Sequence, residues 1–287
     1  MKDAELEALV EAVMRRLETT VAPETAVTTE YVETCVAEVR PVHEVQAPID
    51  AALLERLVAL TSSRIATGRA GNRFLTDLYL RTREGQADAR DAVHSAVPDG
   101  WAEAHGLLPL RSRCKDRHEY LLHPNLGRRL DEASKKRVEQ AQRPETIDVQ
   151  LVVGDGLSPN AIVENGAETL AALRRALSGA GLSTGLDSYV HLARIGVADE
   201  LGVLSHARAT VMMVGERPGL GTGDSLSIYI AVNPRLDQDN AEKNCISNVR
   251  PVGITADEAV ALTVQIVRRS LERGMGGVAL GLGWGRT

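Results

Sequence analysis

Aromatic side chains are scarce in this 287-residue sequence: they make up 3% of it, and Phe74 is the single phenylalanine. A core with so few large rings must be built from Leu, Val, Ile and Ala. That composition suits helices packed on a parallel sheet better than a β-sandwich. Hydrophobic residues (44%) and charged residues (25%) are at ordinary levels, so we expect a globular protein of one large or two small domains.

Long apolar runs and paired cysteines are missing as well. No run reaches the length of a membrane span, and residues 1–20 carry acids where a secretory signal needs a continuous apolar segment. The three cysteines, Cys35, Cys114 and Cys245, are widely spaced and form no CxxC motif. We therefore expect a reducing, cytoplasmic environment.

An excess of positive charge is also absent, since the formal net charge is −6. Nucleic-acid binding requires a concentrated cationic surface, so the charge argues against that class of partner. Basic clusters occur at 111–117 and 128–137, where they are more typical of solvated helix faces. The seven histidines show no HxH or HExxH spacing, which argues against a zinc site.

Residues 1–20 are predicted to form an amphipathic docking helix. Within residues 3–18 the apolar side chains recur with a helical period and make one stripe: Leu6, Leu9, Val10, Val13, Met14 and Leu17. Residues 21–49 have little periodicity and are predicted to be a flexible linker. A helix that folds back on the body is the alternative.

The remainder divides into two predicted domains. Residues 50–145 have mainly helical periodicity and predict a helical N-terminal domain. From residue 146 strand and helix patterns alternate, ending in a long helix at 256–272 capped by Thr255. We therefore predict the α/β class, with a helical N-terminal region followed by a doubly wound, Rossmann-like α/β domain over 146–287.

Three polar motifs stand out in the predicted α/β domain: Val152–Ser158, Met212–Gly219 and Lys243–Arg250. The first two contain apolar runs that are typical of buried parallel strands ending in tight glycine turns. We interpret the third as a further turn of the same cluster. Because ligands bind beyond the carboxyl ends of the strands in open α/β sheets, the motifs predict a ligand crevice.

Each motif has an alternative interpretation. Gly154-Asp-Gly-Leu-Ser lacks the GxGxxG pattern and a phosphate-loop lysine, so a structural turn is favoured over a nucleotide site. Glu216 and Arg217 either face a ligand from a rigid turn or form an internal ion pair. Cys245 is interpreted as a ligand contact or a buried thiol; a nucleophile is disfavoured because no base adjoins it in sequence.

The chain resembles the small (light) subunit of ethanolamine ammonia-lyase from about Leu54 onward. Several motifs in the same order carry the resemblance, which makes it more specific than any one of them. They are Arg64-Ile-Ala-Thr-Gly-Arg-Ala-Gly-Asn-Arg, Tyr120-Leu-Leu-His-Pro-Asn-Leu-Gly-Arg-Arg-Leu, Val152-Val-Gly-Asp-Gly-Leu-Ser, Val214-Gly-Glu-Arg-Pro-Gly-Leu-Gly and Asn244-Cys-Ile-Ser-Asn-Val-Arg.

The resemblance implies an adenosylcobalamin-dependent lyase that converts ethanolamine to acetaldehyde and ammonia by radical chemistry. It implies a hetero-oligomer in which a large TIM-barrel subunit carries the substrate site and the corrin lies between the chains. The family's cofactor contacts carry over to Ile195, Glu216 and Cys245. Ile195 stands where the family can have Val, and both are apolar and β-branched.

We expect neither a catalytic residue nor a metal ligand from this chain. In some cobalamin proteins a histidine replaces the cofactor's dimethylbenzimidazole as the lower cobalt ligand. These proteins carry the motif Asp-x-His-x-x-Gly. Here Asp116-Arg-His118 begins that pattern, but Leu121 stands in the position of the glycine. The cofactor is therefore expected to bind base-on. The rival hypotheses are a scaffold or docking subunit that binds no cofactor and an independent nucleotide-binding enzyme.

The N-terminal helix resembles short tags on the cargo of bacterial microcompartments, which places the protein in the bacterial cytoplasm inside such a shell. A free helix of this length is only marginally stable in water and becomes ordered when its apolar stripe lies in a partner's groove.

Deleting residues 2–18 should leave activity with the large subunit intact and release the enzyme from the shell, as measured by co-purification with shell proteins. Leu9→Glu with Val13→Glu should do the same. Loss of activity or of folding would assign the helix to the body.

Overall fold

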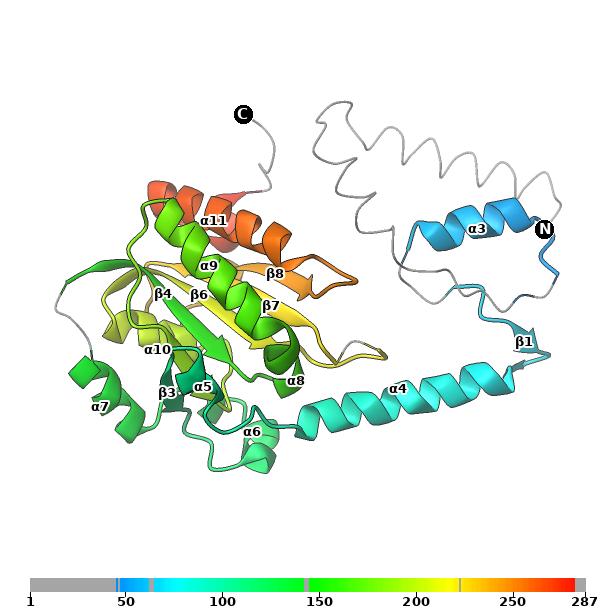
Figure 1. Ribbon diagram of the computed structural model, residues 1–287, viewed down its shortest axis with the longest axis horizontal. Coiled ribbons are helices and arrows are strands. Elements are labelled where there is room, and N and C mark those ends of the chain that lie inside the picture. The colour runs from blue at the N-terminus through cyan, green and yellow to red at the C-terminus, as the bar shows by residue number, and fades with distance from the viewer. Residues whose placement is uncertain (1–44, 46, 62–64, 142–144, 222, 282–287) are drawn as a thin grey trace.

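A six-stranded sheet is the centre of the computed structural model, which describes residues 45, 47–61, 65–141, 145–221 and 223–281 (Figure 1). The strand order is β3-β5-β4-β6-β7-β8. The predicted docking helix and most of the predicted linker lie outside the described residues. None of the described helices has both the length and the apolar character needed to cross a membrane.

The first four strands in this order run parallel to one another: β3 (Leu108–Arg111), β5 (Ser188–His191), β4 (Ile147–Gly154) and β6 (Ala207–Gly215). The last two, β7 (Leu226–Val232) and β8 (Asn244–Val249), continue the sheet in antiparallel pairs. The predicted α/β class is confirmed, with a mixed sheet. The predicted parallel strands at the first two motifs are β4 and β6.

Helices pack on both faces of the central strands. Alternate residues of these strands point to opposite faces and join two different apolar clusters. Val153 and Met213 join one apolar cluster with α9 (Ala167–Gly179) and α11 (Ala256–Arg273). Val152 and Met212 join another with α7 (Glu132–Ala141) and α10 (Val197–Leu204). Figure 1 shows α9 and α11 on the same face of the sheet. Strands buried on both faces explain the continuous apolar runs of the sequence.

The last helix, α11, begins where the sequence predicts. The hydroxyl of Thr255 accepts a hydrogen bond from the amide of Glu258, and the carboxylate of Glu258 accepts one from the amide of Thr255 at 2.9 Å. This capping box satisfies two amides that a helix start leaves unpaired. The helix ends at Gly274, which has the left-handed conformation, φ 66°, that favours glycine.

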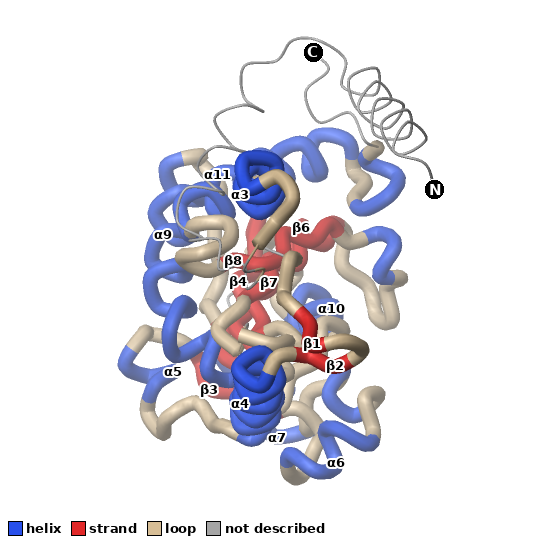
Figure 2. The backbone as a smooth tube through the Cα atoms, turned by 90° about the vertical axis from the view of Figure 1, so that its right-hand side faces the viewer, coloured by secondary structure: helices blue, strands red, loops and turns tan. Residues whose placement is uncertain are grey.

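The N-terminal part of the described chain extends away from the sheet. It consists of α3 (Ala51–Ala59), a short hairpin of β1 (Arg69–Ala70) and β2 (Arg73–Phe74), and the long helix α4 (Thr76–His94). Figure 1 shows α4 projecting from the body, and Figure 2 views it almost end-on. Both α3 and α4 lie within residues 50–145, for which the sequence predicts mainly helical structure, and the β1–β2 hairpin separates them.

The sheet begins before residue 146, the predicted start of the α/β domain. After α5 (Trp101–Ala104) the chain enters β3, which pairs with β5 and forms an edge of the sheet. The described elements also include these short helices: α6 (Arg117–Leu122), α8 (Pro159–Ala161), η1 (Leu126–Arg128), η2 (Ile162–Gly166), η3 (Asn240–Glu242) and η4 (Gly277–Leu280). Strand β3 has four residues and includes Pro109, which is compatible with an edge strand but gives no strand pattern.

The prediction that Lys243–Arg250 forms a turn is wrong. Asn244–Val249 is the edge strand β8, paired with β7 through contacts such as Tyr229 with Cys245. The segment contains no glycine, and its buried residues, Ile246 and Val249, belong to the core under α11. A register shift between Leu226 and Ile228 interrupts the alternation that would have indicated a strand.

Candidate ligand-binding cleft

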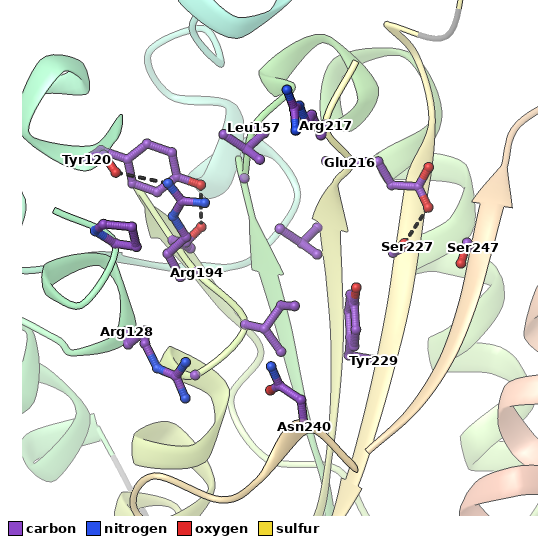
Figure 3. A pocket seen from close by; sticks show the side chains of 17 residues that line it. Tyr120, Arg128, Leu157, Arg194, Glu216, Arg217, Ser227, Tyr229, Asn240 and Ser247 are labelled. Carbon is purple, nitrogen blue, oxygen red and sulfur yellow. Dashed lines mark hydrogen bonds between the residues drawn. The ribbon is translucent and has the colours of Figure 1, made fainter. Parts of the chain in front are cut away.

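A cleft of about 540 Å³ opens at the carboxyl ends of β4, β5 and β6 (Figure 3). Residues that follow these strands line it, including Leu157 after β4, Ile195 after β5 and Glu216 after β6. The predicted crevice therefore exists, at the edge of the sheet where open α/β proteins bind ligands. Further parts of its wall come from β7, α6, η1 and η3, through Ser227, Tyr229, Tyr120, Arg128 and Asn240.

Two glycines let the turns after β4 and β6 touch. Gly156 has φ 59°, and a Cβ atom there would lie 2.3 Å from the carbonyl oxygen of Gly215. A Cβ atom on Gly215 would lie 2.0 Å from the carbonyl oxygen of Ser158. The amide of Leu157 donates to the carbonyl of Gly215 at 3.1 Å. The first motif therefore builds one side of the cleft as a structural turn, the favoured interpretation of its sequence.

Asp155 joins the turn after β4 to the turn after β5. Its carboxylate is 1% exposed and accepts hydrogen bonds from the amides of Leu192 and Ala193, both at 3.0 Å. The Nδ1 atom of His191 lies 2.9 Å from the same carboxylate. Leu192 has φ 56°, an unfavourable conformation for a leucine that this bonding offsets. The start of the segment 192–196 is therefore held by one buried carboxylate.

That segment brings Ile195 to the cleft, as predicted for a ligand contact. Ile195 is half-buried, lines the cavity and packs against the core cluster that includes α10. The amide of Arg194 donates to the carbonyl of Gly127 at 2.8 Å, which joins the segment to η1. The apolar face of Ile195 is thus held at a defined place in the wall.

Glu216 also lines the cleft, where the adjoining strands hold its carboxylate. Oε2 accepts a hydrogen bond from Ser225 at 2.6 Å, and Oε1 accepts bonds from the hydroxyl of Ser227 and, at 3.1 Å, from the amide of Asn248. Within the part of the chain that the structure describes, no ion pair joins Glu216 to Arg217. Figure 3 shows the two side chains apart, so the internal ion pair considered for this turn is wrong.

Cys245 lies at the margin of the cleft, on the exposed side of β8. Its Sγ atom is 3.9 Å from the hydroxyl of Ser227 and 3.5 Å from that of Ser247, and both serines line the cavity. The thiol is exposed, so the interpretation of a buried thiol is wrong. The reason is the alternation of the edge strand, which directs Ile246 into the core and Cys245 outward.

Tyr120 and Arg194 form a stacked pair that the sequence did not reveal. The guanidinium of Arg194 lies 4.2 Å from the centre of the Tyr120 ring and donates to the carbonyl of Tyr120 at 3.0 Å. The phenol of Tyr120 donates to the carbonyl of Ala193 at 3.0 Å, and burial raises its pKa above the usual value. Tyr120 therefore remains a neutral donor that fixes the cleft wall.

Tyr229 is a second phenol in the wall. Burial raises the pKa of Tyr229 to about 12, and the neighbouring thiol of Cys245 adds to the shift. At neutral pH its hydroxyl is protonated. No role was predicted for Tyr120, Arg128, Arg194, Tyr229 or Asn240. The first two lie in a stretch that carries the family resemblance, and that was the available signal.

No cluster of three or more His, Cys, Asp or Glu side chains suited to a metal ion occurs among the described residues. Asp116, from the incomplete cobalamin pattern, has a local structural role. Its carboxylate caps α6 by accepting the amide of Glu119 at 2.8 Å. The cleft itself offers one carboxylate, several arginines, hydroxyls and apolar side chains. These side chains suit a ligand that has an apolar surface and polar groups at its periphery.

The fold and cleft define a class: an α/β protein with a cleft at the carboxyl ends of its strands, the place where open α/β sheets bind ligands. The family model of the ethanolamine ammonia-lyase light chain matches residues 51–281. The chain belongs to this family, as the sequence motifs indicated. It is thus the light subunit of an ammonia-lyase, and a light chain implies a large partner subunit.

Asp155→Asn should lower the free energy of unfolding by about 2–4 kcal/mol, because an amide cannot accept from all three donors and leaves a buried donor unpaired. The matched control is Asp237→Asn, an exposed carboxylate paired with Arg129 at 2.6 Å, which should change stability by less than about 0.5 kcal/mol. Urea denaturation measures both. Equal effects of the two variants would show that Asp155 does not organise the cleft.

Proposed function

We propose that this light chain holds adenosylcobalamin in the cleft, at the interface with a large TIM-barrel subunit that carries the ethanolamine site. The observation that supports this most directly is that Ile195 and Glu216, two residues named by the family resemblance, come together in the one cleft at the sheet edge. The third, Cys245, adjoins it through Ser227 and Ser247. The unit over 146–287 is accordingly proposed as the main cobalamin-binding part.

The residues of the cleft fit a corrin. A corrin has apolar ring surfaces and amide side chains at its edge, and the cleft combines apolar Leu157, Ile195 and Val214 with polar Glu216 and Asn240. Clefts of about 300–1,000 Å³ bury most of a drug-sized ligand. A cobalamin is larger than that, so the 540 Å³ cleft would cover only part of it. The remaining surface is left for the large subunit.

Glu216 is proposed to accept a hydrogen bond from an amide of the corrin. A carboxylate has about four acceptor sites. Ser225 takes one on Oε2, while Ser227 and Asn248 take two on Oε1. One acceptor site on Oε2 is therefore left for a ligand. Because the strands already hold the carboxylate, binding costs little additional ordering of this side chain.

Ile195 and Cys245 are proposed to contact the ligand without hydrogen-bonding chemistry of their own. Ile195 presents a β-branched apolar side chain fixed by the Asp155 junction, which suits packing on the corrin periphery. Cys245 offers a small, polarizable thiol at the cleft margin. Neither role requires the thiol to be a nucleophile.

The cofactor, when bound, supplies the radical chemistry by which ethanolamine becomes acetaldehyde and ammonia. This chain is proposed to contribute binding, orientation and exclusion of water, with the lower cobalt ligand coming from the cofactor's own base. Its described residues include no acid–base pair in the cleft that would act on the substrate. Residence in a bacterial microcompartment, through residues 2–18, stays a prediction.

Separate and combined subunits test the proposal. The purified light chain, the large subunit and their mixture are each incubated with adenosylcobalamin, passed through a desalting column and read by corrin absorption and by ethanolamine turnover. We expect turnover and stoichiometric retention in the mixture and no turnover by the light chain alone. Turnover by the light chain alone would contradict the proposal. Retention by the large subunit alone, unaffected by this chain, would favour the scaffold hypothesis.

Glu216→Gln separates binding from stability. Replacing the carboxylate should weaken cobalamin binding by roughly tenfold to hundredfold, the effect of a charge-assisted hydrogen bond of about 1.5–3 kcal/mol. The matched control is Ser225→Ala, which removes one partner of the same carboxylate from a buried residue that does not line the cleft. Both variants should lower the melting temperature, and only the first should lower affinity strongly. Unchanged affinity in Glu216→Gln would contradict the assigned role.

A further inference from the structure

One end of the cleft carries a guanidinium and a side-chain amide. Both Arg128 and Asn240 line the cleft, and Figure 3 shows them toward the end opposite Arg217 and Glu216. Glu216 is the sole acidic residue among the described residues that line the cleft, whereas Arg128, Arg194 and Arg217 are cationic. The end that holds Arg128 and Asn240 therefore carries positive charge without a carboxylate facing it.

A buried ion pair behind the wall fixes which way Asn240 faces. The ammonium of Lys243 lies 2.9 Å from the carboxylate of Asp199, and their side chains are 2% and 1% exposed. The same ammonium donates to the carbonyl of Gln238 at 3.1 Å and to Oδ1 of Asn240 at 3.4 Å. An ammonium can only donate, so it selects the oxygen of the Asn240 amide. The amide N–H groups of Asn240 are left for the cleft.

Arg128 is held in place without being neutralised. Its stem crosses Gly196, the N-cap of α10, where an added Cβ atom would lie 2.8 Å from Nε of Arg128. Within the described residues its guanidinium forms no hydrogen bond or ion pair. The two acids in the first turn of α10 are engaged elsewhere: Asp199 with Lys243, and Glu200 with Lys135 at 3.3 Å. Burial raises the pKa of Asp199, and the charges of Lys243 and then Arg128 act in the opposite direction.

The backbone adds to the same end of the cleft. Ile195 and Gly196 line the cavity, and their amide N–H groups donate to no carbonyl in the described chain. The N-terminus of α10, an eight-residue helix, follows them directly. The peptide dipoles at the start of a helix favour the binding of an anion. The guanidinium of Arg128 and the amide N–H groups of Asn240 favour the same kind of ligand.

From this arrangement we infer that Arg128 and Asn240 form a subsite for the single anionic group of the ligand, a phosphodiester. The inference rests on the proposed function, because a cobalamin carries one phosphodiester in its nucleotide arm. Arg128 is assigned as the charged donor and Asn240 as the neutral donor, with Lys243 as the positioning residue that fixes the amide. The corrin ring would then lie toward Glu216, and the nucleotide arm toward η1 and η3.

A pair of corrins tests the subsite, because cobinamide lacks the nucleotide arm and its phosphodiester. Dissociation constants of cobalamin and cobinamide are measured by spectroscopic titration of the assembled light and large subunits. Arg128→Ala should weaken cobalamin at least about tenfold and cobinamide less than about twofold. Asn240→Asp places a carboxylate against the anion, so it should also weaken the binding of cobalamin more than that of cobinamide. Because salt screens charges, a higher salt concentration should not increase the loss of affinity in either variant.

Arg217→Ala is the matched control, since it removes an equal charge from the other end of the cleft. It should leave the ratio of the two dissociation constants unchanged. The subsite is overturned if Arg128→Ala weakens both corrins by the same factor or neither, or if Arg217→Ala alone produces the selective loss. Asn240 is exposed, so its variant tests the assignment even if Arg128→Ala fails to fold. A wild-type complex that binds neither corrin would instead refute the proposed function.

Discussion

The carboxylate of Asp155 holds the cleft together because it binds the start of the next loop across the sheet edge. It sits after β4, yet its hydrogen-bond partners are the amides of Leu192 and Ala193, which follow β5. Burial makes these bonds strong and makes their loss costly. The loop that carries Arg194 and Ile195 is therefore positioned by an acid that itself lies out of contact with solvent.

The turn after β6 is set by a different constraint, close backbone packing. Gly156 and Gly215 leave no space for a Cβ atom, so the turns after β4 and β6 meet directly. This contact places Glu216 at the cleft, where Ser225, just before β7, and Ser227, within β7, hold its carboxylate. Two short motifs that are far apart in sequence thereby become adjacent walls of one site.

The chemical character of the cleft accords with a subunit that binds and orients. It has an acceptor at one end, in Glu216, and donors at the other, in Arg128 and Asn240. Its phenols, Tyr120 and Tyr229, have pKa values raised by burial and remain protonated. The family of light chains to which this protein belongs implies a large partner subunit.

The sequence by itself determined the α/β class, the strands β4 and β6, the capped final helix and the family. Those features rest on local signals: continuous apolar runs, glycine turns and the Thr255 capping box. Tertiary structure decided the rest. Strand β8 lacked a regular alternating pattern because of its bulge, and β3 was too short to recognise. Cys245 points outward because its neighbour Ile246 points into the core. The junction of Asp155 with Leu192 and the Lys243–Asp199 pair join residues 37 and 44 positions apart, so only the folded chain brings them together.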